Sequence, residues 1–277
     1  MEYINFEDSY IHEIRLPIYL KTLRVSEVLE SNIIFDIVNQ DQLQELNNVE
    51  ISLDMLDSPK DSSESFHTER NKFVYFKLKN FFHDLPALKY LRLAIEFDEG
   101  KSTKRMIDGL SLNTLDSLTG FSFWTNSSGF SFPISYLPPA CHTLQLCAFT
   151  TFSGQFSDTL NSLKIELNGY GKSFEYFWDR FISPLYNLHC LNIYIADTTE
   201  IVDFSYLDFP YQLHTLALVK KKGECKFIFN ELPPSMSYIL LSCPDMEHRK
   251  NVVVFQNVVD ETFESIFDFH FKNKVLA

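Results

Sequence analysis

The sequence lacks long apolar runs. No window approaches the ~18 consecutive apolar residues that a membrane-spanning helix needs. The first residues, MEYINFEDSYIHEIRL, also lack the basic start and apolar core of a secretory signal peptide. We therefore expect an intracellular protein, cytoplasmic or nuclear, that is not bound to a membrane.

Basic residues are scarce relative to acidic ones. The 24 Lys and Arg against 37 Asp and Glu give a formal net charge of −13. Nucleic acids and anionic membranes both attract basic patches. The only dense basic run, Lys220-Lys221-Lys222, is interpreted as a solvated loop. This balance predicts protein partners and neither a nucleic-acid nor a membrane partner.

Motifs of catalysis and of metal binding are missing. The chain contains no GxGxxG, phosphate-loop, GxSxG or HExxH pattern. The Gly-Lys-Ser within GYGKSF lacks the upstream glycine of a phosphate loop. We expect no enzyme, no catalytic residue and no cofactor. The cysteines form no CxxC pair and are odd in number, so reduced and mostly buried thiols are predicted at Cys141, Cys147, Cys190, Cys225 and Cys243.

What the sequence does contain is a repeated apolar frame, with leucine-type residues at relative positions 1, 4 and 6. A clear copy is Leu188-Leu191-Ile193. Several copies follow a Leu-Pro or Phe-Pro step, as in LPIYLKTLRV and FPYQLHTLAL. The middle residues are Leu23, Val49, Leu91, Phe121, Leu144, Leu163, Leu191, Leu216 and Ile239, with a weaker candidate near Phe76. A repeat of this kind indicates a solenoid, and solenoids usually bind other molecules.

Periodicity predicts the elements of each unit. Frame positions 4 and 6 alternate with polar residues, which is the pattern of a half-buried strand. Strands are expected near Leu91–Leu93, Leu144–Leu146, Leu191–Ile193 and Leu216–Leu218, paired in parallel in sequence order. The segment GKSFEYFWDRFISP has a helical spacing of aromatic residues and ends at Pro184. KFVYFKLKNFFHDLP and VSEVLESNIIFDIVNQ also suggest helices, whereas CAFTTFSGQFSDTL suggests irregular structure.

The LxxLxL frames, their proline-containing lead-ins and their spacing resemble leucine-rich-repeat proteins, in particular the irregular intracellular repeats found beside F-box domains. This resemblance covers roughly residues 16–243. It implies an α/β fold, a leucine-rich-repeat solenoid with a curved parallel sheet on the concave side and irregular helices and loops on the convex side. The asparagine that the family usually places after each strand is not consistently present.

One domain is expected over residues 1–277. Residues 1–15 would form an N-terminal cap, and the Ser- and Asp-rich residues 53–70 a flexible insertion. Residues 244–277 lack the frame and would form a C-terminal cap with a last strand at Val252–Phe255.

Frame positions 3, 5 and 7 should lie on the concave face. Tyr, Trp and Arg are common in the energetically dominant parts of protein interfaces. The alternative is a solvated sheet whose aromatic side chains pack on their neighbours, and we expect the Asn192 side chain to face solvent. The candidate protein-binding residues are Tyr90, Arg92, Trp124, Gln145, Lys164, Asn192 and Tyr194.

Histidines recur at frame position 2, as His142, His189 and His214. A metal site with Cys141 and Cys190 is conceivable, but no pair has zinc-like spacing, so no metal is expected.

The leading functional prediction is a non-catalytic protein-binding scaffold. The alternative is the substrate-recognition subunit of an F-box-type ubiquitin ligase, in which residues 16–40 would form an F-box instead of a first repeat. An enzyme on a non-repeat α/β fold is the third possibility.

Overall fold

The structure is a computed structural model of the 277-residue chain. The residues that it describes are 3–7, 15–26, 37–54, 78–96, 108–125, 131–149, 151–167, 174–195, 201–220, 226–229, 232–242 and 255–256. No helix in these stretches is long and apolar enough to cross a membrane.

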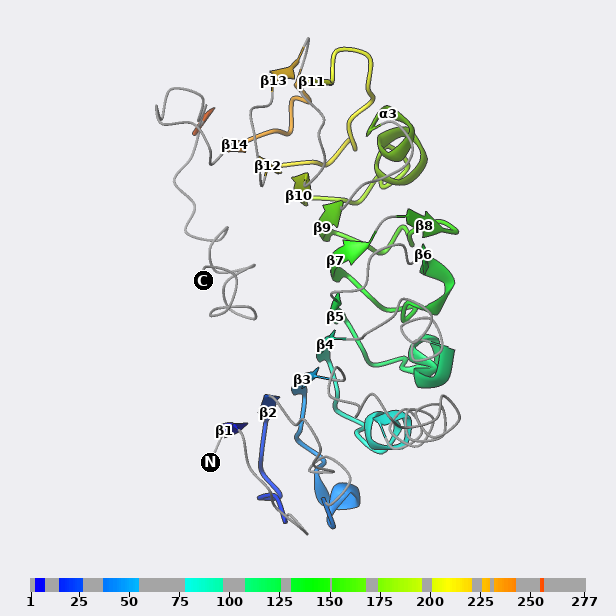
Figure 1. Ribbon diagram of the computed structural model, residues 1–277, viewed down its shortest axis with the longest axis vertical. Helices are drawn as coiled ribbons and strands as arrows, with labels where there is room; N and C mark the ends of the chain where they lie inside the picture. The colour runs from blue at the N-terminus through cyan, green and yellow to red at the C-terminus, as the bar shows by residue number, and fades with distance from the viewer. Residues whose placement is uncertain are drawn as a thin grey trace, which may run out of the picture.

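The described chain is an α/β structure built on one open sheet of 11 strands, in the order β1-β2-β3-β4-β5-β7-β9-β10-β12-β14-β15. All neighbours from β1 to β14 are parallel, and β15 is antiparallel to β14. Figure 1 shows these strands along the inner side of an arc, with the helical segments on its outer side. We call the sheet face turned away from the helical segments the inner face. The strands are β1 (Tyr3–Glu7), β2 (Thr22–Ser26), β3 (Asn48–Asp54), β4 (Tyr90–Glu96), β5 (Gly120–Thr125), β7 (Thr143–Phe149), β9 (Ser162–Leu167), β10 (Cys190–Ile195), β12 (Thr215–Lys220), β14 (Tyr238–Ser242) and β15 (Phe255–Gln256).

The predicted parallel pairing in sequence order is confirmed. The middle residue of each frame stands in register with the middle residue of the next, from Leu23 opposite Val49 to Leu216 opposite Ile239. All the predicted frame centres except the weak candidate near Phe76, which lies outside the described residues, therefore form one row across the sheet. The parallel sheet is thus established, and a repeat solenoid stays a prediction.

Alternation along the strands separates the two faces of the sheet. In β4, Leu91 and Leu93 are buried, whereas Arg92 between them is only half-buried. The buried positions share one core with Phe177 and Trp178 of the outer layer. Frame positions 4 and 6 thus face the outer layer, and positions 3, 5 and 7 face the inner side.

A β-turn with the same hydrogen bond precedes each of nine strands. In each case the N–H of frame position 1 donates to the carbonyl oxygen three residues earlier, as from Leu20 to Pro17 (3.0 Å) and from Leu213 to Pro210 (3.1 Å). Proline is accepted at the first turn residue because only its carbonyl takes part. This explains the proline steps before several frames. The donors are Leu20, Leu46, Leu88, Leu118, Cys141, Leu160, Leu188, Leu213 and Met236.

A main-chain ladder joins the strand entrances. The carbonyl of frame position 2 accepts the N–H groups of positions 2 and 3 of the next unit, as when Lys89 and Tyr90 both donate to Asn47 at 2.9 Å. Because the ladder uses only main-chain atoms, position 2 accepts Lys, Asn, Thr or His. The recurring histidines need no further explanation.

The outer layer mixes short helices with short strand pairs. The helix predicted in GKSFEYFWDRFISP is confirmed as α3 (Phe174–Phe177), which continues in the π-helical η5 (Trp178–Ile182) and ends before Pro184. Residues 78–83 are also helical, and single 3-10 turns form η2 (Gln40–Gln42), η3 (Leu112–Thr114) and η4 (Ile134–Tyr136).

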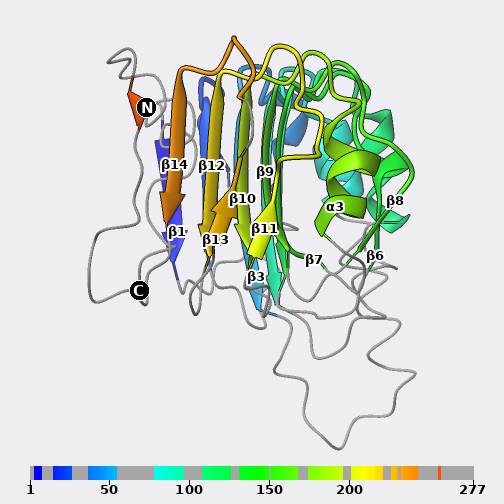
Figure 2. The same cartoon turned by 90° about the horizontal axis from the view of Figure 1, so that it is seen from above.

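The irregular structure predicted for CAFTTFSGQFSDTL is wrong in part, because β7 reaches Phe149 and β8 (Thr151–Ser153) follows. β8 pairs in parallel with β6 (Ser131–Pro133), and β11 (Ile201–Asp203) pairs with β13 (Lys226–Ile228). Phe132 and Phe152 are opposite each other in the first pair and both are buried, so aromatic packing replaces a helix there. Figure 2 shows β6, β8 and α3 together on one side of the large sheet.

Three predicted boundaries differ from the structure. Residues 1–15 contribute β1, an edge strand that continues the sheet beyond the first frame. The predicted insertion at 53–70 begins too early, because Leu53 is buried within β3; residues 55–77 lie outside the described part. In the predicted cap at 244–277, the structure describes β15 alone, which overlaps the predicted strand Val252–Phe255 at Phe255. The helix suggested in VSEVLESNIIFDIVNQ falls mostly on residues 27–36, which are also outside the described part.

Candidate functional site

The strands bring all the predicted binding residues to the inner face. Tyr90 and Arg92 lie on β4 and Trp124 on β5. Gln145 lies on β7, Lys164 on β9, and Asn192 and Tyr194 on β10. Residues from separate parts of the chain become neighbours because parallel pairing puts equal frame positions side by side. We call the row of position-5 residues the middle row: Arg24, Glu50, Arg92, Ser122, Gln145, Lys164, Asn192, Ala217 and Leu240.

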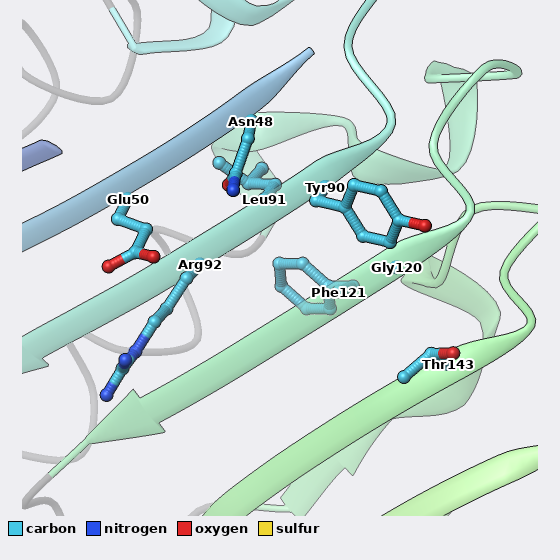
Figure 3. Close-up of a pocket in the computed structure, with 8 residues that line it drawn as sticks. All are labelled: Asn48, Glu50, Tyr90, Leu91, Arg92, Gly120, Phe121 and Thr143. Carbon is cyan, nitrogen blue, oxygen red and sulfur yellow. The ribbon is translucent and has the colours of Figure 1, made fainter. Parts of the chain in front are cut away.

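An ion-pair cluster occupies one end of the middle row. The Arg24 guanidinium contacts the Glu50 carboxylate twice, with Nη2 2.9 Å from Oε1 and Nε 2.7 Å from Oε2. Arg92 flanks Glu50 on the other side, and Figure 3 shows both side chains directed the same way from adjacent strands. Burial lowers the pKa of Arg92, and the nearby Glu50 carboxylate opposes this shift. Because Glu50 lies between two arginines, this end retains positive charge.

A pocket opens beside this cluster. Its lining includes Asn48, Glu50, Tyr90, Arg92 and Thr143, and its empty volume is about 300 Å³, part of which is open to solvent. Figure 3 shows the Tyr90 ring lying over the neighbouring strand at Gly120. A Cβ atom at Gly120 would lie 2.9 Å from Tyr90 Cε1 and closer still to Cδ1, so only glycine accommodates this ring position.

The centre of the face holds a second group of polar residues. The Lys164 ammonium lies 5.2 Å from the centroid of the Tyr194 ring, a cation–π arrangement across strands β9 and β10. Burial raises the pKa of Tyr194, while a hydrogen bond from the Asn192 side chain lowers it. Gln145 Nε2 donates to Cys147 Sγ at 3.4 Å.

The expectation that Asn192 faces solvent is wrong. Asn192 and Gln145 are each only 6% exposed, although both lie on the inner face. Both residues are in register with Lys164 on the strand between them, and the Asn192 side chain is hydrogen-bonded to Tyr194. The inner face is therefore partly closed and not simply solvated.

Sequence reasoning missed Glu50 and Cys147. Glu50 is at position 5 of the Val49 frame, so the frame itself contained the signal. Cys147 is at position 7 of the Leu144 frame and is buried among Gln145, Arg92 and Tyr194, with which it interacts. Cysteine is usually found as a small buried apolar residue, so the sequence gave no reason to place Cys147 in a polar site.

Two of the recurring histidines lie side by side. His189 and His214 stack with ring centroids 5.4 Å apart and an interplanar angle of 8°. Among the described residues, no three His, Cys, Asp or Glu side chains are grouped to hold a metal ion. Cys141, Cys147 and Cys190 are free thiols, as predicted, whereas Cys225 and Cys243 lie outside the described residues.

Comparison with known proteins gave no match to a family model, to a curated protein or to a solved structure.

Proposed function

We propose that this chain is a non-catalytic protein-binding scaffold, a leucine-rich-repeat solenoid that binds its partner on the inner face. The observation that supports this most is the gathering of seven predicted binding residues from β4, β5, β7, β9 and β10 on one face. The repeated frame, the recurring β-turn and the unbroken row of frame centres support the repeat architecture.

The chemistry of the face suits a protein partner. It combines the aromatic rings of Tyr90, Trp124 and Tyr194 with the charged groups of Arg92 and Lys164. Interfaces concentrate binding energy in such side chains, because large rings and guanidinium groups bury much area and still form hydrogen bonds. With a net charge of −13, the chain is expected to bind neither nucleic acid nor anionic membranes.

The described part of residues 16–40 supports a first repeat over an F-box. Thr22–Ser26 forms β2, in parallel register with β3, where an F-box would place a helix. The ubiquitin-ligase alternative therefore has no observation in its favour among the described residues.

Site-specific photo-crosslinking tests the proposal. A photoreactive amino acid placed at Tyr90, Trp124 or Tyr194 should capture the same protein from native cell extract. The exposed outer positions Glu175 and Asp179 serve as controls and should not capture it. An alanine change at one or more of Tyr90, Arg92, Trp124, Lys164 and Tyr194 should weaken binding of the captured protein by about 1–2 kcal/mol or more. Capture only from the outer positions would contradict the proposal.

A further inference from the structure

Three buried polar atoms near the centre of the inner face have no hydrogen-bond partner: Gln145 Oε1, Asn192 Oδ1 and Ser162 Oγ. Their residues are only 6%, 6% and 4% exposed. In register they surround Lys164, because Gln145 and Asn192 flank it on β7 and β10 and Ser162 precedes it by two residues on β9. Buried oxygen atoms normally have donors, so this cluster indicates a ligand that supplies them.

We propose that this cluster binds an extended polypeptide segment whose main-chain N–H groups donate to Gln145 Oε1 and Asn192 Oδ1. This inference rests on the proposed function and narrows it. The partner would present an extended segment across strands β7, β9 and β10, not only a folded surface.

Local charge favours a neutral donor. The Lys164 ammonium belongs to the residue between the two amides, and the Glu166 carboxylate two residues further along β9 acts on the neighbouring Tyr194, so the two charges oppose each other. Neutral N–H groups are common donors in proteins.

Spacing favours main-chain donors over side-chain donors. Gln145 and Asn192 are two strands apart, which separates their backbones by roughly 10 Å. An extended chain presents N–H groups on one side every 6.5–7 Å or so. Gln145 has the longer side chain, which can lean toward β9. This would bring the two acceptor oxygens closer together than their backbones and nearer to the spacing of the N–H groups. A single side chain would not span both acceptors.

The Lys164–Tyr194 pair is a movable cover for these acceptors. The Lys164 side chain extends from the middle row of β9 to the Tyr194 ring, which lies two residues beyond Asn192 on β10. Both covering residues are half-buried, and a cation–π contact of this kind is weak. A ligand that displaces the lysine side chain would reach the amide oxygens.

A peptide selection tests the inference. Linear random-sequence peptides displayed on phage are selected against the full chain, and a selected peptide is then synthesised with each main-chain nitrogen methylated in turn. Methylation at two positions two residues apart should weaken binding to the wild-type chain by about tenfold or more, because each removes one N–H donor. Failure to select any peptide would overturn the inference, as would a selected peptide that tolerates every methylation.

Matched variants give a second measurement. Gln145→Leu and Asn192→Leu should each weaken peptide binding by about tenfold or more, since each removes an acceptor for a main-chain N–H group of the peptide. Asp179→Ala, at an exposed position of the outer layer, is the control and should leave binding unchanged. Unchanged peptide binding in both leucine variants would overturn the inference. If either variant does not fold, the methylation series on the wild-type chain decides the outcome.

The two proposals fail differently. Crosslinking from inner-face positions without any effect of methylation or of the leucine variants would refute the extended segment and leave the scaffold function intact. Crosslinking only from outer positions would refute the scaffold function itself.

Discussion

Leu191 is fully buried at the middle of its frame, with Leu163 on one side and Leu216 on the other. Leu191→Ala should lower the free energy of unfolding by about 2–5 kcal/mol, because it leaves a cavity between three strands. Urea denaturation measures this loss. The exposed outer residue Glu175 is the control, and Glu175→Ala should change stability by about 0.5 kcal/mol or less. Similar losses in the two variants would contradict the strand register.

Cys141 takes the place of leucine at frame position 1, and its burial raises the pKa of the thiol to about 12. In the unfolded chain the Cys141 thiol ionises near pH 9.0, whereas in the folded chain it stays protonated at that pH. The free energy of unfolding should therefore fall as the pH rises above 9.0. Ionisation of this one thiol can lower the free energy of unfolding by at most about 1.4 kcal/mol per pH unit.

Comparing urea midpoints at pH 8 and pH 10 in the wild type and in Cys141→Ala isolates this effect. The alanine variant should lose less stability between the two pH values. Burial also raises the pKa values of Cys190 and Tyr194. Both groups titrate in the wild type and in the variant, so their contributions to the pH dependence cancel in the comparison. Equal pH dependence would show that Cys141 is accessible to water.

Gly120 allows the Tyr90 ring to lie across the neighbouring strand. Gly120→Ala should destabilise the protein by about 1–3 kcal/mol, because the new methyl group overlaps the ring. In a Tyr90→Ala background the same change should cost much less. A double-mutant cycle measures the coupling, and additive losses would contradict this packing.

At the scale of elements, the α3–η5 helix is fixed to the following lead-in by Trp178. Its Nε1 donates to the Asp208 carbonyl at 2.8 Å, and its ring packs edge-on against Phe204 and Phe209. Trp178→Phe should cost about 1–3 kcal/mol, from the lost hydrogen bond and the smaller ring. Chemical denaturation measures the cost, with the exposed Asp179→Ala as the control. A loss no greater than that of the control would show that the helix is not held by this contact.

At the scale of the whole molecule, the sheet is open and its strands are unequally protected. Among the described residues, β9 and β10 have parallel neighbours on both sides, whereas β1 pairs with β2 alone and β14 meets two residues of β15. Amide hydrogen exchange should therefore be slowest in β5, β7, β9 and β10 and at least about tenfold faster in β1 and β14. Slowest exchange at either end would contradict an array that opens from its edges.

Much of the sheet could be predicted because its cause is local. The frame spacing places Leu91 and Leu93 on one side of a strand and Arg92 on the other, and every copy repeats that choice. The edge strand β1 was missed because it lacks the complete frame. The strand pairs β6–β8 and β11–β13 were missed because three-residue strands leave no periodic signal and depend on packing such as that of Phe132 on Phe152.

The sequence by itself determined which residues share the inner face, since alternation and frame position are properties of the chain. Only the tertiary structure decided what those residues do to one another. The Arg24–Glu50 ion pair, the Tyr90 ring over Gly120 and the burial of Asn192 depend on which strands become neighbours. Burial and pairing are set by distances of a few ångströms between residues more than 20 positions apart, and no periodicity in one chain encodes those distances.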